Sequence, residues 1–171
     1  EVVSHSEYHV CNPYLLVKYP RLLQAETVGA RQQLASHRIE TNIYVTPCAY
    51  PPYIYPQIEN KLRQTYSAVR IRNERINHLP VRDPYDIKSY FLGETTRLEQ
   101  IKDLLQQTKQ NNGWLILTFH QIGGEARNLN ISVKKFRRIL KLVRQSQLPV
   151  VLPSQVLQLN HDSVHPSTQK R

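Results

Sequence analysis

The chain of 171 residues is long enough to bury the core of one domain, and its 40% hydrophobic and 21% charged residues are typical of a globular protein. No stretch approaches the ~18 consecutive apolar residues of a membrane helix, so we expect no membrane span. The net charge of +10 would suit nucleic acid. The basic residues are scattered, however, and their densest group, between Lys134 and Arg144, falls on a predicted amphipathic helix where a solvated face explains it. We therefore expect no nucleic-acid partner.

Two further features concern the extent of the chain. It contains no methionine, and its first residues, EVVS, are already typical of a strand. Both features indicate a processed product or a piece of a longer protein. Residues 160–171 are polar and are expected to be disordered, so we assign residues 1–159 to a single domain.

Strand-like and helix-like segments alternate along the chain. Runs of β-branched, aromatic and other apolar residues predict strands at residues 1–4, 42–46, 68–71, 114–119 and 149–152. Helical spacing of apolar residues predicts helices at residues 21–36, 57–66, 98–112, 133–143 and 155–159. A capping box at Thr96–Glu99 opens the third helix and Ser132 caps the fourth, whereas Pro80 and Pro84 predict an irregular connection over residues 73–85. Such β–α alternation with apolar strands implies a parallel sheet, either open or closed into a barrel.

Histidines and aromatic residues follow three of the predicted strands. His5 and His9 follow the first, the segment CAYPPY at residues 48–53 follows the second, and His120 follows the strand WLILTF. The carboxyl ends of parallel strands meet at one edge, where α/β proteins collect their functional groups. We therefore expect these three loops to converge.

His5 and His9 are four residues apart in the sequence HSEYH. If this segment turns helically, both rings lie on one face and offer two of the nitrogen ligands that zinc prefers. The alternative is a solvated turn after a short strand, because a chance pair at this spacing is not rare among seven histidines.

Cys11 and Cys48 are the only cysteines. They form one disulfide in an oxidising compartment or remain free thiols. In a third alternative, Cys11 helps to hold a metal ion together with His9, which lies two residues before it. The sequence leaves these three alternatives open.

Four motifs occur in an order that resembles the polysaccharide deacetylase family, the chitin-deacetylase-like carbohydrate esterases. They are HSEYH, AYP within the aromatic-proline loop, GWLILTFHQI and PVVLPSQVL, and together they extend from Glu1 to about Leu159. The resemblance implies a distorted (β/α) barrel that is incomplete at its N-terminal strand. It also implies metal-dependent hydrolysis of N-acetyl or O-acetyl groups on sugars.

The resemblance assigns roles to individual residues. His5 and His9 would bind a divalent metal, with zinc as the expected ion, and His120 would be the general acid. The loop carrying Tyr50, Pro51 and Tyr53 would line the site for an N-acetylated polysaccharide or oligosaccharide. Trp114, at the start of its strand, is either a core residue or a further platform for the substrate.

The chain also departs from the family. Members begin with a strand ending in T-F-D-D-G, whose aspartates are the catalytic base and the third metal ligand, and no such motif occurs here. Pro52 has no N–H where members use one to hold the oxyanion. Two hypotheses follow. The chain is a deacetylase domain without its first strand, or it is a non-catalytic relative that binds carbohydrate or protein. We also expect an extracytoplasmic location, secreted or periplasmic.

Overall fold

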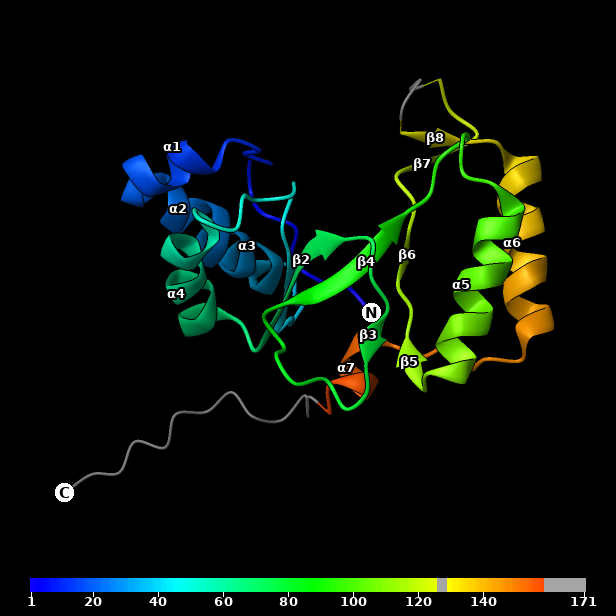
Figure 1. The fold of residues 1–171 in the computed structure, drawn as a ribbon. Coiled ribbons are helices and arrows are strands. Elements are labelled where there is room, and N and C mark those ends of the chain that lie inside the picture. Colours follow the sequence, from blue (N-terminus) through cyan, green and yellow to red (C-terminus); the bar gives the residue numbers. More distant parts are fainter. Residues whose placement is uncertain (126–128, 159–171) are drawn as a thin grey trace.

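Four parallel strands form the central sheet of the structure, a computed structural model that describes residues 1–125 and 129–158 (Figure 1). The strands are β1 (Ile43–Val45), β2 (Ala68–Asn73), β4 (Ile87–Phe91) and β6 (Leu117–Thr118). Their order in the sheet, β1-β2-β4-β6, follows their order in the chain, and every neighbouring pair is parallel. The sheet curls into half of a barrel (Figure 1). The expectation of an α/β fold with a parallel, barrel-like sheet is confirmed at this level.

The N-terminal segment joins the sheet beside β1 through one bridge. Ser4 pairs in parallel with Tyr44: the Ser4 N–H donates to the Ile43 carbonyl at 3.0 Å, and the Val45 N–H donates to the Ser4 carbonyl at 2.8 Å. Ser4 is fully buried, and its hydroxyl accepts a hydrogen bond from the Tyr66 hydroxyl at 2.9 Å. The strand predicted at residues 1–4 is therefore confirmed only around Ser4. That bridge fixes the point at which His5 leaves the sheet.

Four helices pack on one side of the sheet (Figure 1). They are α1 (Pro13–Lys18), α2 (Pro20–Gln24), α3 (Ala30–Ser36) and α4 (Tyr55–Thr65). A π-helical turn, η1 (Ala25–Gly29), joins α2 to α3, so the helix predicted at residues 21–36 is confirmed as one helical run. Side chains alternate between the two faces of a strand. Tyr44 and Val69 accordingly face these helices and pack in one core cluster with Leu16, Ile58 and Leu62.

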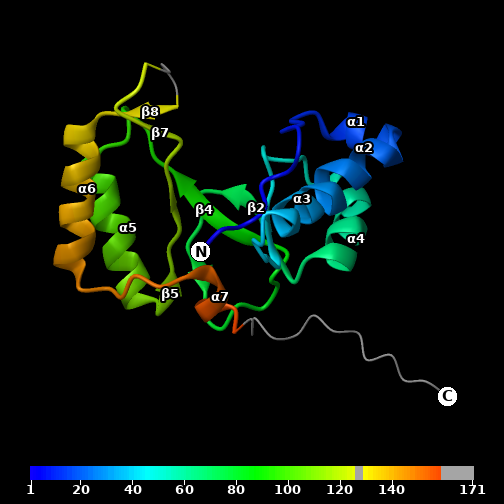
Figure 2. The same cartoon turned by 180° about the vertical axis from the view of Figure 1, so that it is seen from behind.

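Helices α5 (Leu98–Gln110) and α6 (Val133–Ser146) pack against each other beside the β4–β6 end of the sheet, as Figure 2 shows from behind. The Ser132 hydroxyl accepts a hydrogen bond from the Lys135 N–H at 3.3 Å, which confirms the predicted N-cap of α6. The predicted capping box at Thr96–Glu99 is wrong. Arg97 is the N-cap of α5 and makes no side-chain cap, whereas the Thr96 hydroxyl accepts the Gly93 N–H at 3.0 Å.

The apolar run WLILTF forms two short strands instead of one. Its first residue belongs to β5 (Gly113–Trp114), which pairs antiparallel with β3 (Asn77–His78), and β6 then pairs in parallel with β4. The Asn77 side chain joins these elements, because its amide donates to the carbonyls of Lys88 and Trp114 and accepts the Lys88 N–H. β3 lies in the connection predicted to be irregular. β4 was not predicted, because Lys88 and Ser89 interrupt its apolar pattern.

The last part of the described chain differs from the expectation. Residues 149–152 form no strand, and Val150 is 84% exposed. An apolar run becomes a strand only when a neighbouring strand is in reach, and periodicity does not reveal one. β7 (Gln121–Ile122) pairs with β8 (Asn130–Ile131), and α7 (Pro153–Val156) ends the fold.

Two sequence expectations concern the chain as a whole. Among the described residues, no helix is long and apolar enough to span a membrane. The tail expected at residues 160–171 lies outside the described part of the chain.

Candidate functional site

A cavity of about 360 Å³ lies at the carboxyl ends of the parallel strands. Its walls include His5, the end of β1 and the loop after it, the middle of β2, and the end of β6 with the residues that follow. His5, Arg70 and His120 are the nitrogen-bearing side chains among the described residues that line it. The structure thus brings together the loops of His5, Cys48 and His120, which the sequence predicted to converge.

His5 is held by the strand beside it. Its Nδ1 lies 3.0 Å from the Val45 carbonyl oxygen, and because a carbonyl only accepts, Nδ1 carries the proton and Nε2 keeps its lone pair. The pKa of His5 is lowered, first by partial burial of the ring and then by the nearby His9, Arg70 and His120. The hydrogen bond to Val45 opposes this shift. At neutral pH His5 is therefore an uncharged imidazole with a free nitrogen.

His9 lies next to His5, but not through a helical turn. The segment between them is a bend, with Ser6 at φ 71° and His9 at φ 58°, and the His9 N–H donates to the Ser6 hydroxyl at 3.1 Å. The two rings nevertheless meet edge to face, with centroids 5.1 Å apart. The prediction of a helical His5–His9 face is wrong, whereas the closeness of the rings stands.

Glu26 positions the loop that carries both histidines. This fully buried carboxylate on η1 accepts the Tyr8 N–H at 2.7 Å and the Val10 N–H at 3.0 Å, one on each oxygen. Sequence reasoning missed it. The available signal was a carboxylate on the same face of a predicted helix as Leu22 and Leu23, which needs a polar partner when it is buried.

Cys11 and Cys48 form a disulfide with Cα atoms 5.2 Å apart. It joins the histidine loop, residues 5–12, to the aromatic-proline loop, residues 48–53. Of the three alternatives left open by the sequence, the structure contains this one. Cys11 is therefore no metal ligand in this form, because metals bind the thiolate and not a disulfide sulfur. The Cys11 sulfur lies 3.8 Å from Nδ1 of His9.

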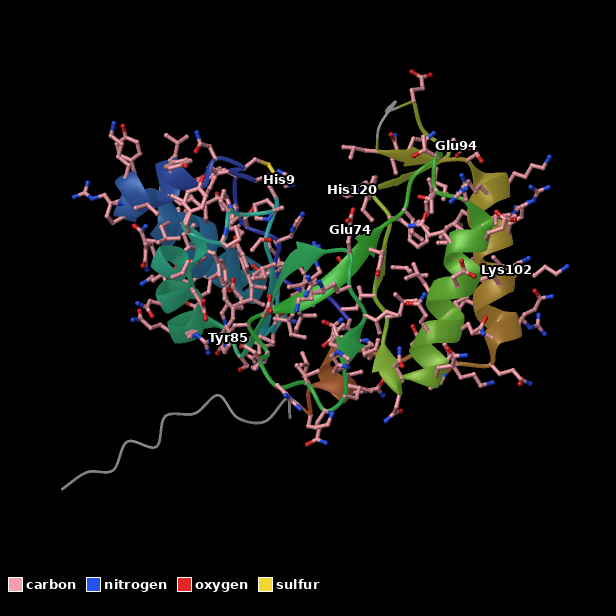
Figure 3. All side chains as sticks on the ribbon, viewed as in Figure 1. His9, Glu74, Tyr85, Glu94, Lys102 and His120 are labelled. Carbon is pink, nitrogen blue, oxygen red and sulfur yellow. A yellow bond between two sulfur atoms is a disulfide. The ribbon has the colours of Figure 1, made fainter. Side chains whose placement is uncertain are left out.

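His120 follows β6 at the same end of the sheet and is exposed at the cavity. Its ring meets the edge of Phe91, with centroids 4.9 Å apart. Figure 3 shows His9 and His120 at the same end of the molecule. Packing of β6 fixes the backbone of His120 and leaves its ring accessible, as a proton donor requires.

The aromatic residues of the predicted substrate site separate into different places. Tyr50 is buried in the core, where its hydroxyl donates to the Val10 carbonyl at 3.4 Å, so no face of it is free to stack on a sugar. Pro51 starts the turn into α4, since its carbonyl accepts the N–H groups of Ile54 and Tyr55. Tyr53 is 69% exposed and shares a hydrogen bond with the Tyr14 hydroxyl, 2.9 Å away. Only Tyr53 remains available to a ligand.

Trp114 lies away from the histidines. It is buried with Ile43, Ala68 and Ile87, the residues that begin the three neighbouring strands. This cluster is at the amino ends of the strands, opposite the cavity. The substrate-platform alternative for Trp114 is therefore not supported, and the core alternative describes its position.

Arg70 is a residue of the cavity that sequence reasoning missed. It lies on β2 two positions after Ala68, so both side chains are on the inner face of the sheet. Its guanidinium donates to the Ser89 hydroxyl at 3.0 Å, and burial lowers its pKa. An arginine on the inward face of an apolar strand was the signal that could have identified it.

No carboxylate occurs among the described residues that line the cavity. Glu74 directly follows β2 at the same end of the sheet (Figure 3), where its N–H donates to the Ser89 carbonyl at 2.6 Å and its side chain is exposed. The cavity therefore combines two histidines and an arginine, with His9 beside His5, and Glu74 lies at the same end of the sheet.

No protein-family model, curated protein or solved structure matches this chain. The resemblance to polysaccharide deacetylases therefore rests on the short motifs of the sequence alone.

Proposed function

We propose that this chain carries the histidine part of a metal-dependent hydrolase site that removes acetyl groups from a carbohydrate polymer, on a barrel of the deacetylase type. The observation that carries the proposal is the shared cavity. His5 from the first edge of the sheet and His120 from the last strand line the same space, with the His9 ring beside His5. The disulfide suits an oxidising compartment, so we propose a secreted or periplasmic location.

The separation of the His5 and His9 rings is compatible with two ligands of one zinc ion. Two imidazoles on one tetrahedral ion, with Zn–N bonds of ~2.0–2.1 Å, keep their ring centroids roughly 5 Å apart. The rings of His5 and His9 have this separation, and Nε2 of His5 keeps the lone pair that a ligand needs. A catalytic zinc uses three protein ligands. The third would have to come from outside the described lining of the cavity.

The remaining side chains have distinct tasks in this reaction. A bound zinc ion would supply a Lewis acid for the acetyl carbonyl and for water. His120 would protonate the leaving amine or alcohol, and the Arg70 guanidinium, on the cavity wall, would attract the oxygen on which negative charge develops. His5, uncharged through its lowered pKa, stays available as a nitrogen ligand and does not compete with His120 as an acid.

The general base is the role in this mechanism for which the described lining of the cavity offers no carboxylate. Hydrolysis needs a general base to take the proton of the attacking water, and the deacetylase family uses a carboxylate for this step. Glu74 is our candidate for this task, because it directly follows β2 at the cavity end of the sheet. The Glu74→Gln variant tests this role directly.

A second function is favoured by one specific observation, the lack of a carboxylate among the described residues that line the cavity. A site with histidines and arginine but without a carboxylate as general base can hold a sugar or an anionic group without hydrolysing it. In this alternative the chain is a non-catalytic, deacetylase-like domain that binds carbohydrate or protein.

One experiment separates the two functions. The chain is loaded with Zn²⁺ and incubated with an acetylated chito-oligosaccharide, and both released acetate and bound oligosaccharide are measured. Acetate release that falls in His120→Ala but not in His37→Ala, an exposed histidine at the end of α3, supports the hydrolase. Binding without acetate supports the binding domain. Neither binding nor acetate overturns both.

A further inference from the structure

The Cys11–Cys48 disulfide lies beside His9 in a group whose chemistry depends on the oxidation state. A ring nitrogen of His9 and the sulfur atoms of Cys11 and Cys48 lie within 4.8 Å of one another. The histidine loop contributes two of these residues and the aromatic-proline loop contributes the third. As a disulfide, the sulfur atoms hold no metal.

We propose that reduction of this disulfide creates a metal site formed by His9, Cys11 and Cys48, which binds a thiolate-seeking divalent ion such as zinc. A dithiol reductant attacks one sulfur, the S–S bond breaks, and the reductant leaves as its own disulfide. Two electrons and two protons pass to the protein and give two thiols. When the ion binds, both thiols release their protons and the two thiolates coordinate it.

The positions of the donor atoms agree with such a site. Around a tetrahedral zinc, with bonds of ~2.3 Å to sulfur and ~2.0–2.1 Å to nitrogen, neighbouring ligand atoms lie roughly 3.5–3.8 Å apart. Nδ1 of His9 lies 3.8 Å from the Cys11 sulfur. Once the bond is broken, the Cys48 sulfur needs only a side-chain rotation to reach a similar distance, because the Cα atoms are 5.2 Å apart.

The two loops are held together by contacts that do not involve the disulfide. Glu26 accepts the N–H groups of Tyr8 and Val10 in the histidine loop. The Tyr50 hydroxyl of the aromatic-proline loop donates directly to the Val10 carbonyl. These bonds remain after reduction, so the thiols stay near each other and near His9 without the covalent link.

The site is open to both a reductant and an ion. His9 and Cys11 are exposed, and Cys48 is half-buried. Three protein ligands also leave one position of a tetrahedral ion for water or a substrate. The inference does not rest on the proposed hydrolase, although it shares His9 with it: after reduction, two thiolates would compete with His5 for the same ion.

Cobalt titration tests this inference. The oxidised chain and the chain reduced with a phosphine, then freed of reductant under anaerobic conditions, are titrated with Co²⁺. We expect the near-ultraviolet absorption of a thiolate–Co²⁺ bond, at one ion per chain, only after reduction, and its loss when Zn²⁺ is added. Co²⁺ bound by histidines alone gives no such band, so failure of this site and failure of the His5–His9 site are distinguishable.

Variants show whether the band comes from this cluster. Cys11→Ser should abolish it, and His9→Ala should weaken Co²⁺ binding to the reduced chain by at least about tenfold. His37→Ala is the matched control and should bind as the parent chain does. Absence of the band in the reduced chain, or equal affinity in His9→Ala, overturns the inference. The second outcome also reveals the case in which reduction unfolds the loops and the thiols bind without His9.

Discussion

The two ends of the parallel sheet are built from the same strands, yet they have opposite character. At the amino ends, four side chains form a buried apolar cluster: Ile43, Ala68, Ile87 and Trp114. At the carboxyl ends, Arg70 on the same inner face lines a cavity together with His5 and His120. On β2 the change from one environment to the other takes two residues. The depth of a residue along its strand therefore decides whether its side chain supports the fold or faces a ligand.

Replacing Trp114 tests the apolar end and should have the largest effect on stability. Trp114→Ala leaves a cavity among buried residues and should lower the free energy of unfolding by ~3–5 kcal/mol. Denaturant unfolding followed by circular dichroism measures this change. Tyr53→Ala, at a 69% exposed position, is the control and should change stability by less than about 0.5 kcal/mol. A loss for Trp114→Ala as small as that of the control would contradict the buried-core assignment.

His120→Ala tests the polar end. As a general acid, His120 should contribute at least about a hundredfold to turnover of an acetylated oligosaccharide. The zinc content should stay normal, because His120 is not one of the proposed ligands, and stability should change little, because the ring is exposed. Turnover comes from acetate release and zinc content from elemental analysis. A variant that keeps its activity, or that loses zinc instead, refutes the role.

Glu26→Gln tests how the polar end is held in place. The amide oxygen accepts only one of the two N–H groups that the carboxylate now accepts, so the substitution should cost about 1.5–3 kcal/mol. Hydrogen exchange at the Tyr8 and Val10 amides should accelerate more than exchange in α6. Glu99→Gln, an exposed glutamate on α5, is the control. Unchanged exchange at Tyr8 and Val10 would mean that other contacts hold the loop.

The pH dependence of stability gives the smallest effect. The folded pKa of His5 is lowered below its ordinary ~6.5, so the unfolded chain binds more protons as the pH falls. His5 therefore lowers stability progressively as the pH drops below about 6.5, until the folded pKa is passed. Denaturant midpoints measured from about pH 7.5 to about pH 5 should fall less steeply in His5→Gln than in the parent chain. Equal slopes would show that His5 titrates normally.

Local sequence patterns determined much of the fold. The helical run from Pro20 to Ser36, the N-cap Ser132 and the strand at residues 43–45 were all readable, because helix periodicity, capping and β-branched runs act over a few residues. The edge at which His5 and His120 meet was also predictable, since every parallel strand ends at the same side. Their catalytic and metal-binding roles remain proposals.

The tertiary structure alone decided how distant residues meet. It selected the disulfide between cysteines 37 residues apart, brought Glu26 to the amides of the histidine loop, and put Arg70 into the cavity. It also split the run WLILTF, where the Asn77 side chain joins β3, β4 and β5, and left residues 149–152 without a strand partner among the described residues. The physical reason is the same in each case. An apolar run or a charged side chain has a preference for burial or pairing, but its partner exists only after the chain between them has folded.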